Sequence, residues 1–145
     1  MDIFEACRVG NLEILQTLLE EGIQPNIENQ SGQTALMEAS MYGRLSCVEA
    51  LLQAGAKPDI QTNRGWTALM LASEMGHVPC VKALLKAGAD PNIQDDNDLT
   101  ALIWASHRGY NNIVKILKRM FIVQFLNKRI KMFNYDLIRE LLYFL

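Results

Sequence analysis

Histidine and cysteine side chains are the groups in this sequence that could act as nucleophiles, proton carriers or metal ligands. The chain holds two histidines, His77 and His107, and three cysteines, Cys7, Cys47 and Cys80. Neither histidine has a cysteine or an aspartate at the spacing of a catalytic triad or of a zinc site. We therefore expect no catalytic residues, no metal and no cofactor, and we interpret the chain as non-enzymatic.

An acidic stretch, Asp95-Asp96-Asn97-Asp98, superficially resembles a calcium-binding loop. It lacks the central glycine and the terminal glutamate that such a loop needs at fixed offsets. The chain also has no glycine-rich loop that could cradle a phosphate. We interpret the acidic stretch as a polar turn.

The secondary-structure elements that position these side chains can be predicted from a segment that occurs three times. It reads TALMEAS at 34–40, TALMLAS at 67–73 and TALIWAS at 100–106, so the copies are 33 residues apart. Other residues recur in the same register, namely Gly43, Gly76 and Gly109, then Val48, Val81 and Val114, then Leu51, Leu84 and Leu117. A fixed period of this length is typical of stacked repeats, in which no unit buries its apolar surface alone.

The repeated segments resemble ankyrin repeats, whose period is about 33 residues and whose first helix opens with Thr-Pro-Leu-His. The resemblance covers roughly residues 1–120, and it fails in two columns of the pattern. The residues in those columns are Ala35, Ala68 and Ala101 in place of proline, and Met37, Met70 and Ile103 in place of histidine. In the family that histidine ties neighbouring loops together, so we expect apolar packing to contribute more to this tie here.

The resemblance implies an all-α solenoid of stacked helix–turn–helix units. We expect an N-terminal capping repeat at 1–30, two further repeats at 31–63 and 64–96, a C-terminal repeat at 97–120 and a helical tail at 121–145. Each repeat is predicted to run as a loop, a short helix, a tight turn and a second helix.

Local signals predict where these helices begin and end. Thr34, Thr67 and Thr100 are placed as N-caps, since a hydroxyl can accept a hydrogen bond from a free amide of the first turn. Glycine ends helices well because the left-handed conformation costs it least. The predicted ends are Gly43, Gly76 and Gly109 for first helices, and Gly55 and Gly88 for second helices. Pro79 suits the first turn of a helix, and Ala39, Ala72 and Ala105 are small enough to let neighbouring helices approach.

The cysteines are interpreted as reduced, buried residues. Cys47 and Cys80 occupy equivalent positions of adjacent repeats, where helices lie roughly 8–10 Å apart. A disulfide needs Cα atoms within about 7 Å. No secretory signal opens the chain, and no apolar run reaches the roughly 18 residues of a membrane span. We expect a cytoplasmic location, with the nucleus as the alternative.

In ankyrin proteins the loop tips and the inner, concave face of the first helices bind partners, and the resemblance implies the same for fifteen positions here. They are Gln30, Ser31, Gln33, Met41, Tyr42, Asn63, Arg64, Trp66, Glu74, Met75, Asp96, Asn97, Leu99, His107 and Arg108. Trp66 and Tyr42 stand out because aromatic residues and arginine dominate interface energetics. The alternative for Trp66 is a ring folded back on the next loop. Trp104 is expected to pack, with the tail as one packing partner, and His77 to be structural.

The implied function is a non-catalytic module that binds a protein partner, as a scaffold, an adaptor or an inhibitor. Residues 1–114 hold 14 acidic and 7 basic side chains, whereas residues 115–145 hold 2 acidic and 7 basic ones. The acidic body is a poor binder of nucleic acid. The alternative is a membrane- or calmodulin-associated adaptor that acts through the basic tail. We expect a monomer.

The tail differs in composition from the repeats, since residues 121–145 contain no alanine, glycine, serine, threonine or proline. Apolar residues recur there at steps of three and four, at Ile122, Leu126, Ile130, Phe133, Leu137, Leu141 and Phe144. This spacing predicts a helix that continues the last repeat past Met120. We expect a break near Asn134–Asp136, with Asn134 capping a final short helix. Three interpretations stay open: a C-terminal cap, a partner- or membrane-binding helix, and sequence under no selection.

Overall fold

The structure, a computed structural model, describes residues 1–143. These residues form helices and loops without a β-strand, which confirms the all-α fold. The described helices are α1 (Ile3–Val9), α2 (Leu12–Glu20), α3 (Ala35–Met41), α4 (Leu45–Gln53), α5 (Ala68–Glu74), α6 (Val78–Lys86), α7 (Ala101–Arg108) and α8 (Asn111–Tyr143).

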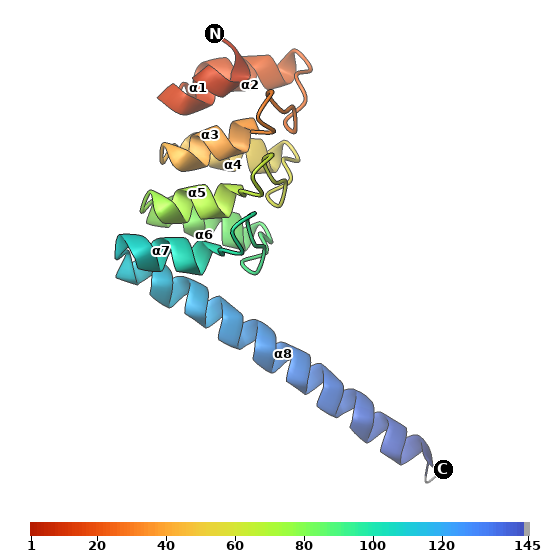
Figure 1. Ribbon diagram of the computed structural model, residues 1–145. Helices are drawn as coiled ribbons and strands as arrows, with labels where there is room; N and C mark the ends of the chain where they lie inside the picture. Colours follow the sequence, from red (N-terminus) through yellow and green to blue (C-terminus); the bar gives the residue numbers. More distant parts are fainter. Residues whose placement is uncertain (144–145) are drawn as a thin grey trace.

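The helices stack as pairs along one direction, with the connecting loops together on one side (Figure 1). The first helices of the pairs form a continuous row, because α1 contacts α3, α3 contacts α5 and α5 contacts α7. The second helices form a parallel row in which α2 contacts α4, α4 contacts α6 and α6 contacts α8. Each pair therefore buries its apolar surface against the next pair, as expected of a solenoid.

The predicted helix ends are confirmed. The hydroxyls of Thr34, Thr67 and Thr100 accept hydrogen bonds from the amide three residues later, at 3.3, 3.3 and 3.4 Å. Gly109 caps α7 in the left-handed conformation, with φ of 77°. Pro79 lies in the first turn of α6. These signals act locally, so a sequence pattern is enough to find them.

Gly43 makes room for the next repeat as well as for the turn. Its φ is 68°, and a Cβ atom built on it would lie 2.6 Å from Nδ1 of His77. The His77 ring uses this space to donate from Nε2 to the carbonyl oxygen of Met41, at 3.0 Å. His77 therefore has the structural role expected from the sequence, and it joins two neighbouring repeats.

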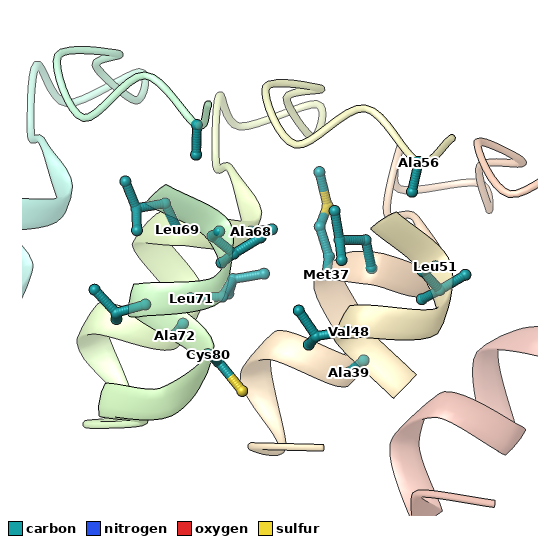
Figure 2. Close-up of a cluster of buried hydrophobic side chains, with 14 of the residues drawn as sticks. Met37, Ala39, Val48, Leu51, Ala56, Ala68, Leu69, Leu71, Ala72 and Cys80 are labelled. Atoms are coloured by element: carbon teal, nitrogen blue, oxygen red, sulfur yellow. The ribbon is translucent and has the colours of Figure 1, made fainter. Parts of the chain in front are cut away.

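The core runs through all the repeats as one cluster. Ala39, Ala72 and Ala105 are buried at the seams between first helices. Figure 2 shows side chains of α3 and α4, among them Met37 and Val48, lying against those of α5 and α6, among them Cys80. The cluster confirms that adjacent repeats share one apolar interior.

The tie between neighbouring loop tips has a polar as well as an apolar part. Met37 and Met70 are buried in the core, as expected for residues that replace the family histidine. The tips themselves are nevertheless joined by backbone hydrogen bonds, from the Asn63 amide to the Ser31 carbonyl (3.0 Å) and from the Asp96 amide to the Arg64 carbonyl (3.1 Å). Polar contacts, and not apolar packing alone, therefore hold the tips together.

Helix α8 corrects one expectation about the tail. It runs past Met120 as predicted, but the break near Asn134–Asp136 is wrong, because α8 continues to Tyr143. No proline or glycine lies in 111–143 to interrupt it. The helix leaves the stack (Figure 1), and residues 121–143 are exposed. Gln124 still accepts a hydrogen bond from Nδ2 of Asn92 at 3.2 Å. Phe144 lies outside the described residues.

Candidate functional site

The inner face of the stack carries the residues that differ most between repeats. Six columns of the segment at 34–40 keep one chemical class in all three copies, and the fifth column changes class, with Glu38, Leu71 and Trp104. In the structure these three residues lie on successive first helices α3, α5 and α7. We define the inner face as this column together with the adjoining loop tips. Sequence reasoning missed the column, although the change of class within a constant segment was a usable signal.

A hollow of about 420 Å³ opens where the second and third loop tips meet α5. It is lined by Ser31, Gln33, Thr62, Asn63, Arg64, Trp66, Leu71 and Glu74. Six of these were predicted from the sequence, and Thr62 and Leu71 were missed. We call it the Trp66 hollow. It combines an apolar floor from Trp66 and Leu71 with a polar rim.

Trp66 owes its position to the following repeat. The ring centroids of Trp66 and Trp104 lie 4.5 Å apart, with the planes tilted by 37°. Trp104 Nε1 donates to Oδ2 of Asp95 at 2.9 Å, and its ring meets His107 edge-on at 6.1 Å. The prediction that Trp104 packs is thus correct, and these partners belong to the repeats. The half-buried Trp66 ring leans on the next repeat and also lines the hollow.

The buried carboxylate of Asp95 holds the acidic turn in its conformation. Asp95 Oδ1 accepts from the amides of Asn97 (2.9 Å) and Leu99 (3.0 Å), while Oδ2 accepts from Trp104. Among the described residues, no cluster of three or more His, Cys, Asp or Glu side chains is placed to hold a metal ion. Asp95 therefore orders the turn and fixes the Trp104 indole.

Two ion pairs join first helices across the inner face. Arg8 Nε meets Glu38 Oε2 at 3.2 Å, and Arg108 Nη2 meets Glu74 Oε1 at 2.6 Å. Both carboxylates are largely shielded, whereas both guanidinium groups are about half exposed. Hydrogen bonding to these carboxylates raises the pKa of Arg8 and of Arg108. The pairing holds Glu74 at the edge of the Trp66 hollow with a fixed orientation.

The family follows from a comparison with known proteins. A family model described as ankyrin repeats, in three copies, matches residues 3–95 and 57–124. The chain belongs to the ankyrin-repeat family. Ankyrin repeats are in general protein–protein interaction modules and are typically non-enzymatic. No curated protein matches the chain. Within residues 1–143, no helix is both long enough and apolar enough to cross a bilayer.

The other predicted positions lie outside the Trp66 hollow on the same ankyrin stack. Gln30 is next to it, where its carbonyl accepts from Nδ2 of Asn63 at 3.1 Å. Asp96, Asn97 and Leu99 belong to the last loop tip. The remaining five lie at or next to the ends of first helices and are Met41, Tyr42, Met75, His107 and Arg108. The structure thus gathers six of the fifteen predicted residues around one hollow.

The three cysteines of the ankyrin body are free and buried, as predicted. Burial raises the pKa of Cys7 to about 12 and the pKa of Cys80 to about 11, and it also raises the pKa of Cys47. A thiol with so high a pKa stays protonated and is a poor nucleophile at neutral pH. The cysteines therefore serve as small apolar residues of the core.

Proposed function

We propose that the protein is a non-catalytic interaction module that binds a protein partner through its inner face, with the Trp66 hollow at the centre of the contact. The observation that carries this proposal is the hollow itself, in which a half-buried tryptophan and Leu71 meet a polar rim contributed by two loop tips and α5. Buried aromatic anchors inside a polar rim are typical of the energetic centres of protein interfaces.

The roles of the lining residues differ. Trp66 and Leu71 offer apolar surface to a side chain of the partner, and Arg64 and Ser31 offer hydrogen-bond donors at the rim. Asn63 has a positioning role, because its amide and side chain tie the third tip to the second at 3.0 and 3.1 Å. Glu74 can accept hydrogen bonds while Arg108 holds it in place.

Preorganisation is the mechanism that this arrangement supports. The tips are tied to one another, and the Trp66 ring is held by Trp104, before any partner arrives. Binding then orders few side chains, and the entropy lost on docking is small. A scaffold, an adaptor and an inhibitor that covers an enzyme would all use this property. We place this activity in the cytoplasm or the nucleus.

The proposal is tested by comparing the proteins that the wild-type chain captures with those captured by two variants. One variant is changed at the hollow and the other is changed away from it. Arg64→Glu reverses a charge at the rim of the hollow. Lys82→Glu makes the same change of charge on an exposed site of α6, in the second row of helices. We expect a protein that wild type and Lys82→Glu retain and that Arg64→Glu loses. Equal capture by Arg64→Glu would show that the hollow is not the binding site.

A further inference from the structure

The exposed part of α8 carries an apolar row that no other part of its own chain covers. The row consists of Ile122, Leu126, Ile130, Phe133, Leu137 and Leu141. Steps of three and four place these residues on one side of the helix, over a length of about 30 Å. Their exposed fractions lie between 50% and 67%. Continuous apolar surface of this kind marks an interaction site more often than scattered exposed residues do.

We propose that this row is covered by the same row of a second copy of the chain, in an antiparallel pair of α8 helices. This proposal goes beyond the binding function of the inner face, and it departs from the monomer expected from the sequence. It rests on the self-complementarity of the row and of the polar residues on both of its sides.

The apolar row is symmetric about the midpoint between Ile130 and Phe133. In an antiparallel pair centred there, Ile130 faces Phe133 of the second copy, and Phe133 faces Ile130. The next layers pair Leu126 with Leu137 in the same way. A two-fold interface requires that residue i faces j while j faces i, and each of the four central residues of the row meets an apolar residue in this register.

The two sides of the row are self-complementary in the same register. Arg129 and Asp136 are seven residues apart, which is two turns of helix, so they lie on the same side of the row. Asn127 and Asn134 are likewise seven residues apart and lie on the other side. In an antiparallel pair each side faces itself. Arg129 of one copy then faces Asp136 of the other, twice, and the asparagines face one another.

A parallel pair would not have this match. There the two sides of the row face each other, so Arg129 would face the asparagine side and Asp136 would gain no cation. The charges therefore select the antiparallel arrangement and its register. A groove of about 680 Å³ also runs along this part of the helix. It is lined by Phe125, Lys128, Arg129, Ile130, Met132, Phe133 and Asp136. A side chain of the second copy can enter such a groove, as knobs enter holes in coiled coils.

A membrane surface or calmodulin fits this row less well. Asp136 borders the row, and Glu140 lies on the same face as Phe133, seven residues earlier. Both carboxylates would face lipid phosphates or acidic side chains. Arg139 projects from the side of the helix away from the row, as its spacing from the row requires. A second copy uses the acidic residue beside the row, whereas an anionic surface would be repelled by it.

The antiparallel pair keeps the two ankyrin stacks apart. Leu117 is the last residue of α8 that is buried in the repeats. The two copies of this residue would lie about 40 Å from one another along the paired helices, given a rise of 1.5 Å per residue. Both inner faces stay accessible, so the pair presents two binding sites and gains avidity for a partner with repeated epitopes.

The test is sedimentation of the full chain over about a hundredfold range of concentration. It compares wild type with variants in which charges across the proposed contact are reversed. We expect wild type to shift from monomer to dimer. Arg129→Asp and Asp136→Arg each place like charges opposite one another and raise the dissociation constant about tenfold. The double variant exchanges the two charges and restores wild-type association. Arg139→Asp, with the same change of charge on the side of the helix away from the row, leaves association unchanged.

Several results would overturn the proposal. They are a wild type that stays monomeric at every concentration, single reversals that associate as wild type does, and a double variant that fails to recover. Circular dichroism of each variant at high dilution checks that α8 stays helical independently of association. Binding to phosphatidylserine vesicles or to calmodulin by a chain that does not self-associate would identify another occupant of the row and would also reject the dimer.

Discussion

The indole rings of Trp66 and Trp104 lie 4.5 Å apart although the residues come from consecutive repeats. Their closeness joins the third loop tip to α7, and the bond from Trp104 Nε1 to Asp95 Oδ2 at 2.9 Å fixes the second ring in turn. The Trp66 wall of the hollow is therefore supported by the following repeat. If the hollow binds the partner as proposed, stability and binding are coupled through the two tryptophans.

Replacement of Trp104 tests this coupling. Trp104→Ala removes the stacking surface and one of the hydrogen bonds to Asp95, so we expect a loss of about 2 kcal/mol in the free energy of unfolding. Trp104→Phe keeps an aromatic ring and removes only the N–H, and about 1 kcal/mol is expected. Urea denaturation of both variants measures the difference. Equal losses would mean that ring stacking contributes nothing.

Gly43 provides a test of how closely adjacent repeats approach. Gly43→Ala combines a left-handed φ of 68° with a Cβ that would lie 2.6 Å from His77. Gly55→Ala has a left-handed φ of 92° but meets nothing within 4 Å. Backbone strain alone costs about 1 kcal/mol, and we expect Gly43→Ala to cost at least another 1 kcal/mol from overpacking. Thermal unfolding of the two variants checks this, and indistinguishable midpoints would contradict the contact with His77.

The buried thiols predict how stability depends on alkaline pH. In the unfolded chain a cysteine titrates near its ordinary pKa of 9.0, whereas in the folded chain the pKa is about 12 for Cys7 and about 11 for Cys80. Because the folded state holds the proton to higher pH, these groups contribute full stability below pH 9 and lose it as pH rises toward 12. Urea denaturation should therefore show a free energy of unfolding that falls as the pH rises from about 8 to about 11. Cys7→Ala should show a weaker decline, and an unchanged slope would contradict the assignment.

Glu38 provides a test of its ion pair with Arg8. The same column holds Leu71 in the next repeat, so Glu38→Leu copies a side chain that the stack already accommodates. We expect Glu38→Leu to be neutral or to stabilise by about 1 kcal/mol, because the desolvation of a buried carboxylate is removed. Arg8→Met leaves the Glu38 carboxylate unpaired and should destabilise instead. Chemical denaturation distinguishes the two, and equal destabilisation would show that the pair is net stabilising.

The fold was predictable where residues act locally or repeat. The three threonine caps, the glycines and the seam alanines depend on the chain within a few residues and on a constant period. The bounds of α3 and α5 follow from them. The inner face was predictable as a set of columns, since each repeat places the same column on the same surface. Leu71 was missed because attention to exposed polar and aromatic residues overlooked an apolar residue in the column that varies.

The sequence by itself determined the stacking of the repeats, since a 33-residue period with caps and small seam residues allows no other burial of the apolar surface. The tertiary structure alone decided that Trp66 rests on Trp104, that Asp95 is committed to that indole, and that α8 leaves the stack unbroken. The physical reason is that these features depend on contacts between residues that lie far apart in the sequence. The Trp66 contact joins residues of different repeats, and the course of α8 depends on the last helix pair having no further neighbour, neither of which is encoded by spacing within a repeat.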